Sequence, residues 1–184
     1  MSAVQSRMVA LGTPAPEFNL LDVVSGKNIA LSDIKSDKAT VIMFICNHCP
    51  YVINLYEHLA EFTAEYMEKG ISFVAINSNN YLVYTDDAPD KMKQVAQRLG
   101  YKFPYLVDDT QEVAKSFQAE CTPDFFVYDS NLKLIYRGQY DSSRPGNGIP
   151  VNATDLKNAL DAVLDGREVS SKQVPSIGCN IKWK

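Results

Sequence analysis

Residues 40–50 read Thr-Val-Ile-Met-Phe-Ile-Cys-Asn-His-Cys-Pro, and this stretch decides the fold. Its first part, 40–45, is an unbroken β-branched and apolar run, which is typical of a strand covered on both faces. Its second part ends in Pro50, which suits the first turn of a helix because its missing N–H would have no partner there. The stretch therefore predicts a core strand that leads through a pair of cysteines into a helix.

The chain that follows continues this alternation of strand and helix. Apolar side chains at helical spacing predict a helix over 50–69, and Gly70 stands where a helix C-cap belongs. Residues 71–76 form a second apolar run and predict the next strand. A strand, a helix and a strand in this order form a right-handed parallel βαβ unit by default, so the centre of the sheet should be parallel.

The remaining periodic segments complete the expected fold. Helices are predicted over 89–99, 111–117 and 153–164, and strands over 104–107, 124–128 and 133–137. The last two strands should form an antiparallel hairpin at one edge, and segments 18–20 and 27–30 suggest another hairpin near the N-terminal end. The sum is an α/β fold with a central mixed sheet, helices on both faces and an N-terminal β-hairpin extension.

Length and composition favour a single domain over 1–184, with a core over about 12–164 and a tail, 165–184, that lacks periodicity. With 46% hydrophobic and 22% charged residues, the chain is neither disordered nor collagen-like. A net charge of −4 offers no electrostatic footprint for nucleic acid. No apolar run reaches the length of a membrane helix and residues 1–10 lack a secretory pattern, so we expect a cytoplasmic protein with no membrane partner.

The four cysteines, Cys46, Cys49, Cys121 and Cys179, are the feature that points to chemistry. They are too few for a disulfide scaffold, and in the cytoplasm they are expected to be free, catalytic or metal-bound. Cys46 and Cys49 are separated by two residues at the junction of strand and helix, so their sulfurs can approach disulfide distance. This position predicts a redox-active pair.

The junction also assigns roles within the pair. The unpaired N–H groups and the positive end of a helix stabilise a thiolate, so we expect a lowered pKa at Cys46. Cys46 would be the exposed attacking thiolate, and Cys49 the buried resolving thiol one turn inside. His48 adds positive charge, and Asn47, His48 and Pro50 together are expected to tune the site. A stabilised thiolate makes the pair more oxidising.

A metal site is the main alternative to redox chemistry. A Cys-x-x-Cys pair supplies half of a tetrahedral zinc site, which Cys121, Cys179 or His58 could complete. The strand–helix setting and the lack of a second Cys-x-x-Cys favour redox chemistry, so no metal is predicted. His58, at the border of the apolar helix face, is expected to be structural, and the acidic residues of segment 86–90 are interpreted as helix N-terminal caps.

Several segments make the chain resemble a known family. Residues 12–20 and 31–34 (Gly-Thr-Pro-Ala-Pro-Glu-Phe-Asn-Leu and Leu-Ser-Asp-Ile) resemble the leading hairpin of peroxiredoxins. Residues 46–49 resemble the thioredoxin dithiol, and 122–129 (Thr-Pro-Asp-Phe-Phe-Val-Tyr-Asp) resembles the Thr-Pro segment before the hairpin strand. The chain is therefore similar to the thioredoxin-fold group that joins peroxiredoxin-type (alkyl hydroperoxide reductase/thiol-specific antioxidant) sequences to a thioredoxin-type Cys-x-x-Cys. Its ending, 177–184, resembles that of an uncharacterised peroxiredoxin-like subgroup.

The chain departs from both parent families at the site. Peroxiredoxins place a Pro and a Thr or Ser before a single peroxidatic cysteine. With Cys49 in that place, Ile42 and Cys46 stand at these positions, and the Arg of the peroxide site falls at or near Pro123. Thioredoxins carry a buried Asp below the dithiol, where this chain has Thr40. The resemblance thus implies a dithiol without the peroxide-activating residues and without the usual carboxylate.

The resemblance also implies roles for a second site segment. Thr122 and Pro123 correspond to the cis-proline turn of the family, which faces the dithiol and leaves the backbone of residue 122 free to pair with a substrate strand. Cys121 precedes this turn and is a candidate accessory thiol close to Cys46. Cys179, expected to be partly exposed in the tail, is left open: it could resolve a mixed disulfide, pair with Cys121 or be inert.

The expected function is that of a thiol–disulfide oxidoreductase with an antioxidant role. Cys46 attacks a protein or small-molecule disulfide, and Cys49 resolves the mixed disulfide. No Gly-x-Gly-x-x-Gly fingerprint for FAD or NADPH is present, so we expect no cofactor beyond the redox-active disulfide. An electron-donor reductase system must then supply an external thiol reductant. A thiol-dependent peroxidase is the alternative, and a zinc- or copper-binding module through the same cysteines is the third possibility.

Overall fold

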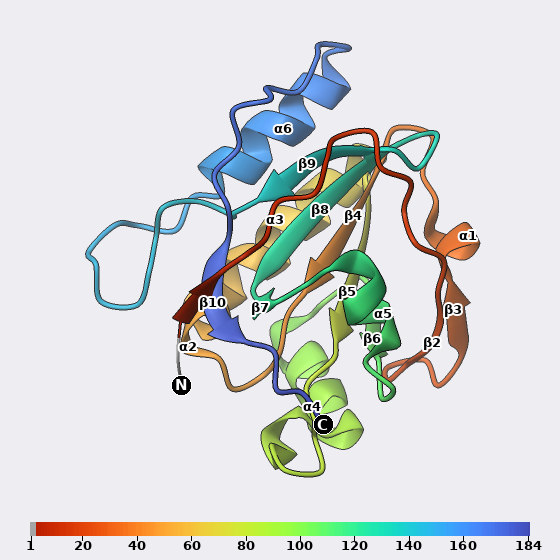
Figure 1. The fold of residues 1–184 in the computed structure, drawn as a ribbon, viewed down its shortest axis with the longest axis vertical. Coiled ribbons are helices and arrows are strands. Elements are labelled where there is room, and N and C mark those ends of the chain that lie inside the picture. Colours follow the sequence, from red (N-terminus) through yellow and green to blue (C-terminus); the bar gives the residue numbers. More distant parts are fainter. Residues whose placement is uncertain (1–2) are drawn as a thin grey trace.

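The computed structural model describes residues 3–184, and its centre is a seven-stranded mixed sheet (Figure 1). The strand order is β3-β2-β6-β5-β4-β8-β9, and a second, three-stranded sheet has the order β1-β10-β7. The strands are β1 (Ala3–Gln5), β2 (Asn19–Asp22), β3 (Asn28–Ala30), β4 (Ala39–Phe44), β5 (Ser72–Asn77), β6 (Tyr105–Val107), β7 (Cys121–Thr122), β8 (Asp124–Asp129), β9 (Leu134–Gly138) and β10 (Ile177–Asn180).

Strand β4 explains why residues 40–45 are continuously apolar. It pairs in parallel with β5 and antiparallel with β8, so it lies inside the sheet. All of its residues are buried, with Val41 and Met43 packed into one core and Ile42 and Phe44 into another on the opposite face. The predicted central strand and the parallel pairing of the βαβ unit are confirmed.

Helices cover both faces of the sheet. They are α1 (Leu31–Ile34), α2 (Pro50–Ile53), α3 (Tyr56–Glu68), α4 (Pro89–Leu99), α5 (Glu112–Phe117) and α6 (Thr154–Leu164), with a 3₁₀ turn, η1, at Thr85–Asp87. Side chains of α2, α3, α4 and α6 pack into the core that holds Met43, and those of α1 and α5 into the core that holds Phe44. Within residues 3–184, no helix combines the length and apolarity that a membrane crossing requires.

The helix expected over 50–69 is divided in two. After α2, the N–H of Leu55 donates to the carbonyl of Val52, which is a tighter turn than an α-helix makes. The α-helical ladder resumes when the N–H of Leu59 donates to Leu55. The prediction of one continuous helix is wrong because apolar spacing does not report this local tightening. Gly70, with φ of +91°, ends α3 as expected.

Both predicted hairpins are present. β2 pairs antiparallel with β3, and β2 also pairs with β6, so the N-terminal hairpin extends the main sheet at that edge. At the other edge, β8 and β9 form the second hairpin. The predicted fold class, a mixed sheet with an N-terminal hairpin extension, is confirmed.

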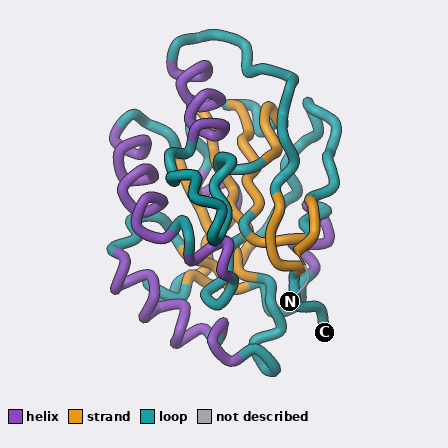
Figure 2. The backbone as a smooth tube through the Cα atoms, turned by 90° about the vertical axis from the view of Figure 1, so that its left-hand side faces the viewer, coloured by secondary structure: helices purple, strands orange, loops and turns teal. Residues whose placement is uncertain are grey.

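The tail contains a strand that the sequence does not reveal. β10 lies between β1 and β7 and pairs antiparallel with both, near the end of the molecule where the two termini lie (Figure 1, Figure 2). A Cβ atom on Gly178 would lie 2.0 Å from the carbonyl oxygen of Thr122, so this close approach requires glycine. The expectation of a tail without regular structure is wrong, because long-range pairing rather than local pattern forms this strand.

Candidate active site

The cysteine pair lies where β4 ends and α2 begins. Cys46 follows the carboxyl end of the strand, and Cys49 is the N-cap residue of α2, with Pro50 in the first turn. The carbonyl of Cys49 accepts the first helical hydrogen bond, from the N–H of Ile53, at 2.9 Å. The N-terminus of α2 therefore acts on Cys49 more directly than on Cys46.

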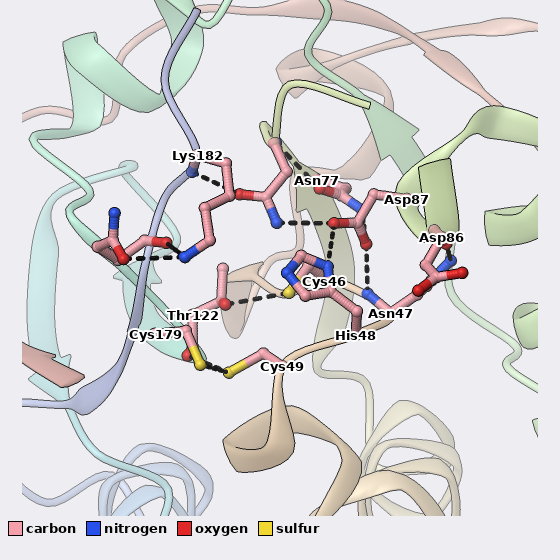
Figure 3. A network of polar contacts seen from close by, with 12 residues as sticks. Cys46, Asn47, His48, Cys49, Asn77, Asp86, Asp87, Thr122, Cys179 and Lys182 are labelled. Atoms are coloured by element: carbon pink, nitrogen blue, oxygen red, sulfur yellow. Dashed lines mark hydrogen bonds and ion pairs between the residues drawn. The ribbon is translucent and has the colours of Figure 1, made fainter. Parts of the chain in front are cut away.

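The peptide bond between Thr122 and Pro123 is cis, as the resemblance implies. Thr122 contacts both sulfurs of the pair: Cys46 Sγ lies 3.2 Å from its Oγ1, and Cys49 Sγ lies 3.3 Å from its carbonyl oxygen (Figure 3). The short strand β7 thus faces the dithiol.

A third sulfur completes the site. Cys179 lies opposite Thr122 in the pairing of β10 with β7, and its Sγ is 2.6 Å from Cys49 Sγ (Figure 3). The side chain of Cys179 is buried, so the expected partial exposure is wrong. Pairing of the tail with β1 and β7 withdraws this residue from solvent and brings it to the pair.

Neither cysteine of the pair is open to solvent. Cys46 is 1% exposed and Cys49 is 0% exposed. The expectation of Cys46 as an exposed thiolate is wrong, because β7 contacts both sulfurs and Cys179 of β10 lies on Cys49. A substrate disulfide can reach either sulfur only after part of this cover moves.

The charge within the pair is the reverse of the expectation. Hydrogen bonds from the thiols of Cys46 and Cys179, together with nearby backbone N–H groups, outweigh burial and lower the pKa of Cys49 to about 5. Burial, the adjacent Cys49 sulfur and the negative charge of Asp87 raise the pKa of Cys46. In the reduced pair the thiolate therefore belongs to the N-cap residue Cys49, and the proton to Cys46.

A buried carboxylate lies on the other side of Cys46. Oδ2 of Asp87 is 2.6 Å from Nδ1 of His48, and the carboxylate also accepts hydrogen bonds from the N–H of Asn47 at 2.7 Å and the side chain of Asn79 at 2.8 Å. Burial alone would raise the pKa of Asp87, but these donors outweigh it and lower the pKa. The interpretation of Asp87 as a helix cap is wrong, and the site has a carboxylate although residue 40 is Thr.

A signal for this carboxylate was present in the sequence. Asn77, Ser78 and Asn79 form a polar run at the carboxyl end of β5, and Asp87 follows shortly after. β5 is parallel to β4, and the carboxyl ends of neighbouring parallel strands meet at one edge of a sheet, where functional groups gather. This rule would have placed Asp87 near Cys46.

His48 links the Asp87 carboxylate to Cys46. The hydrogen bond to Asp87 raises the pKa of His48 in spite of partial burial. The ring stacks on Tyr84 with centroids 5.4 Å apart, and within residues 3–184 its buried Nε2 has no hydrogen-bond partner. One ring nitrogen, the Cys46 sulfur and an Asp87 oxygen lie within 4.8 Å of one another. The imidazole is therefore placed to exchange a proton with Cys46.

Asn47 holds the loop between the two cysteines. Its side chain donates to the carbonyl of Asp86 at 2.8 Å and accepts from the hydroxyl of Tyr105 at 3.0 Å, and its carbonyl accepts from Tyr56 at 2.6 Å. The role of Asn47 is thus to position the backbone of this loop, rather than to contact a sulfur.

Two predicted residues lie apart from the sulfurs of the pair. Cys121 is buried with a raised pKa, and its sulfur contacts the carbonyl of Pro123 at 3.9 Å. The expected approach of Cys121 to Cys46 is wrong, because successive side chains of a strand point to opposite faces and it is Thr122 that faces the pair. His58 bonds the hydroxyl of Tyr140 at 2.8 Å, as expected of a structural boundary histidine.

Similarity to distant solved structures identifies the fold. The chain is similar to the thioredoxin domain of a thiol-disulfide oxidoreductase from Bacteroides vulgatus, with 17% identity, a TM-score of 0.59, and coverage of 71% of this chain and 89% of that chain. It is also similar to Peroxidoxin BcpB from Mycobacterium tuberculosis, with 20% identity, a TM-score of 0.62, and coverage of 85% and 96%. These likenesses show that the fold is thioredoxin-like, as predicted.

The chain belongs to the Redoxin family, which matches residues 10–160. A solved structure of an uncharacterized conserved protein from Geobacillus kaustophilus is 58% identical, with a TM-score of 0.98 and coverage of 100% of this chain and 97% of that chain. A hypothetical protein from Sinorhizobium meliloti 1021 is 46% identical, with a TM-score of 0.95 and 98% coverage of both chains. The thiol-disulfide oxidoreductase ResA of Bacillus anthracis is 26% identical over 125 residues, which are 68% of this chain and 67% of that protein.

Proposed function

We propose that this protein is a thiol–disulfide oxidoreductase whose redox centre is the Cys46/Cys49 pair. The observation that carries the proposal is the meeting of these two sulfurs, one with a strongly lowered pKa, with a cis Thr122-Pro123 turn at the end of a core strand. Membership of the Redoxin family and the similarity to ResA support the same chemistry. Disulfide exchange needs one sulfur to attack and a second to resolve, and the pair provides both.

The reaction begins from the reduced pair, in which Cys49 carries the charge and Cys46 the proton. The Cys49 thiolate and the imidazole of His48 are both placed to accept this proton. The Cys46 thiolate then bonds to one substrate sulfur while the other substrate sulfur leaves. Cys49 attacks Cys46 and releases the second substrate thiol, so two electrons pass to the substrate and a Cys46–Cys49 disulfide remains.

Thr122 orients the attacking sulfur. Its hydroxyl lies 3.2 Å from Cys46 Sγ and opposes the other groups by lowering the pKa of Cys46. The backbone of Thr122 is the edge at which a substrate strand would pair. The substrate is a protein or small-molecule disulfide, and an external thiol reductant from a reductase system regenerates the pair.

Reduction of insulin disulfides, with a thiol reductant as electron source, tests the proposal. We expect turnover by the native chain, none by Cys46→Ser, and a trapped mixed disulfide at Cys46 in Cys49→Ser. Cys121→Ser is the matched control and should keep its activity, because that thiol does not contact the pair sulfurs. Lack of turnover with insulin and with small-molecule disulfides would overturn the assignment.

A specific observation favours a thiol-dependent peroxidase as the second candidate. The lowered pKa belongs to Cys49, which stands at the peroxidatic position in the resemblance to peroxiredoxins. Hydrogen peroxide would oxidise its thiolate to a sulfenic acid, and a neighbouring thiol would form a disulfide with it and release water. The peroxide site of peroxiredoxins also uses an arginine, whereas the buried Arg137 of this chain forms an ion pair with Asp124 at 3.1 Å. Rapid turnover of hydrogen peroxide without turnover of insulin would replace the first proposal. An antioxidant role is compatible with either chemistry.

Metal binding is the third candidate, through donors that differ from the predicted ones. The donor cluster in residues 3–184 is Cys46, His48 and Asp87, rather than three thiols or His58. A thiolate, an imidazole and a carboxylate are all zinc ligands. Metal analysis of protein purified without oxygen tests this candidate. Stoichiometric zinc or copper that is lost in Cys46→Ser and kept in Cys121→Ser would overturn the redox assignment.

We propose the cytoplasm as the compartment of this activity. Four cysteines are too few for a disulfide scaffold and fit a compartment in which reductases keep thiols reduced. Thiol trapping in intact cells, combined with fractionation, tests this point. A fully oxidised protein in an extracytoplasmic fraction would contradict it.

A further inference from the structure

The edge of β7 beside the cis-proline is already occupied by the tail of the same chain. β10 pairs antiparallel with β7, with Cys179 opposite Thr122 and Asn180 opposite Cys121. A substrate strand is expected to add to the sheet at this edge. β10 therefore uses the backbone groups that a substrate strand would use.

The fit of the tail to this edge is specific. A Cβ on Gly178 would lie 2.0 Å from the carbonyl oxygen of Thr122 and 3.1 Å from Cδ of Pro123, so the approach depends on a residue without a side chain. β10 also pairs with β1 on its other side, so its backbone is held from both edges.

The tail is also tied to the polar network around His48. Beyond β10, the N–H of Lys182 donates to the side chain of Asn79 at 2.8 Å, and the same Asn79 donates to Asp87 at 2.8 Å (Figure 3). The carbonyl of Lys182 accepts from the side chain of Gln111 at 2.8 Å. These hydrogen bonds fix the position of the tail over the site in addition to the pairing of β10.

We propose that β10 is an internal occupant of the substrate position and that Cys179 is a third redox residue, which accepts the disulfide from the Cys46/Cys49 pair. The inference rests on the proposed dithiol chemistry. The sulfurs of Cys49 and Cys179 lie 2.6 Å apart, so little movement separates them from the ~2.05 Å of a disulfide bond. The register of β10 aims Cys179 at Cys49, whereas Cys46 contacts the hydroxyl of Thr122.

The step is an exchange within the chain and needs no further oxidant. The sulfur of Cys179 attacks Cys49 Sγ in the Cys46–Cys49 disulfide, and the bond between Cys46 and Cys49 breaks as the bond between Cys49 and Cys179 forms. The proton of Cys179 passes to the released sulfur of Cys46. The number of disulfides stays constant, so the two-electron oxidation remains in the protein.

The exchange fixes β10 covalently over the substrate edge. With a Cys49–Cys179 disulfide, β10 is bonded over the cis-proline, the substrate edge is closed and Cys46 is a free thiol. A reductant that breaks this bond reopens the edge. In the reduced chain no covalent bond holds β10 over this edge, so a substrate strand competes with it directly.

Disulfide mapping tests the role of Cys179. The reduced full-length chain is treated with glutathione disulfide, quenched with acid, alkylated and mapped by mass spectrometry. We expect a Cys49–Cys179 bond in the native chain and in the control Cys121→Ser, and only a Cys46–Cys49 bond in Cys179→Ser. In Cys46→Ser the Cys49–Cys179 bond should still form. A native chain with only the Cys46–Cys49 bond at every time would overturn the role of Cys179.

Gly178→Ala tests the cover separately from the thiol. The added methyl group pushes β10 away from Thr122 and leaves Cys179 in the chain. We expect alkylation of reduced Cys46 and reduction of a peptide disulfide to become severalfold faster, with an unchanged circular dichroism spectrum. Cys179→Ser keeps the backbone pairing of β10 and should leave the alkylation of Cys46 near the native rate. Native rates in Gly178→Ala, or equal acceleration in both variants, would refute the cover.

The inference and the proposed function fail in different ways. If no variant catalyses turnover of insulin or of a small-molecule disulfide, but stoichiometric oxidation by glutathione disulfide gives the Cys49–Cys179 bond, the oxidoreductase assignment is wrong and Cys179 remains a redox residue. If the native chain turns over substrate and only the Cys46–Cys49 bond is found, the assignment stands and the role of Cys179 is wrong.

Discussion

The two sides of the cysteine pair are built from different chemistry (Figure 3). On the side of Cys46 lies an imidazole held by a buried carboxylate, with 2.6 Å between His48 and Asp87. On the side of Cys49 lie the N-terminus of α2 and the sulfur of Cys179, which is also 2.6 Å away. The first side is suited to moving protons, and the second is suited to holding negative charge and exchanging sulfur.

This difference explains why the charge is on Cys49 rather than on Cys46. The negative charge of Asp87 disfavours a thiolate at Cys46, while hydrogen-bond donors surround Cys49. The two sides come from different parts of the chain, one from the segment after β5 and the other from the tail. A dithiol enzyme needs both, since each exchange moves protons as well as sulfur bonds.

Removal of the sulfur that carries the charge should have the largest effect on the site. In Cys49→Ala we expect the turnover of insulin to fall to the uncatalysed rate, because nothing resolves the mixed disulfide at Cys46. The thiolate absorbance of the reduced protein, which should titrate with a pKa of about 5, should disappear. Ultraviolet titration measures this, with Cys121→Ala as control. A titration near pH 5 that survives in Cys49→Ala would assign the thiolate to Cys46.

The next largest effect is on stability as a function of pH. The pKa of a cysteine in the unfolded chain is about 8.5, whereas the pKa of Cys49 in the folded chain is about 5. Between these values the unfolded chain binds more protons, so the free energy of unfolding of the reduced protein should rise with pH, by up to about 1.4 kcal/mol per pH unit. Urea unfolding with excess reductant measures the slope.

His48 contributes to the same profile with the opposite sign. Its pKa is raised in the folded state, so its stabilisation is present below its unfolded pKa and is lost as pH rises through the folded pKa. Cys49→Ser should therefore lose the rise and keep only this decline. A rise that persists in Cys49→Ser would mean that another group drives it.

A smaller effect is expected from a change at Asp87, on the side of the pair where His48 and its carboxylate lie. Asp87→Asn removes the charge that His48 and three backbone or amide donors share. We expect the pKa of His48 to fall and the free energy of unfolding to decrease by about 1–3 kcal/mol, because buried donors lose a charged acceptor. Nuclear magnetic resonance titration and urea unfolding measure the two effects. The control is Asp86→Asn, because Asp86 uses its backbone carbonyl at the site; equal losses in both variants would contradict the specific role of Asp87.

The smallest effect on the rate of exchange is expected at Thr122, which contacts both sulfurs of the pair. Thr122→Val removes the hydroxyl at 3.2 Å from Cys46 and keeps the shape of the side chain. The loss of one hydrogen bond should slow formation of the mixed disulfide by the equivalent of about 0.5–1.5 kcal/mol and raise the pKa of Cys46. Thr122→Ser should restore both. The pH dependence of the rate decides the outcome, and a rate loss without a pKa change would make Thr122 a packing residue only.

Much of the fold could be predicted because its elements carry local patterns. The run over 40–45 identified the central strand, and the spacing over 89–99 predicted α4 with the bounds it has in the structure. Two elements escaped for physical reasons. The break between α2 and α3 is a change of hydrogen-bond spacing that leaves the apolar face intact. β10 is a short strand that pairs with β1 near the N-terminus and with β7, more than fifty residues before it in the chain.

The residues of the site also fall into those that local sequence predicts and those that it does not. Cys46, Cys49 and the Thr122-Pro123 turn could be placed together, since the first two share a strand–helix junction and the turn carries a recognisable family pattern. Asp87 and Cys179 could not, because their contacts with the pair join positions far apart in the chain. Local sequence predicts a helix cap at Asp87 and a partly exposed tail residue at Cys179, but Asp87 is buried against His48 and Cys179 against Cys49.

Local sequence is enough to place two cysteines at the end of a core strand and the start of a helix. Residue spacing and local hydrogen bonding decide such a junction, and both are visible in a short stretch of chain. Long-range contacts in the folded chain set the other properties of the site: which sulfur holds the charge, which carboxylate lies beside it and which strand covers it. Those properties depend on Asp87, Thr122 and Cys179, whose fields and contacts act on the pair only after long-range pairing has brought them together.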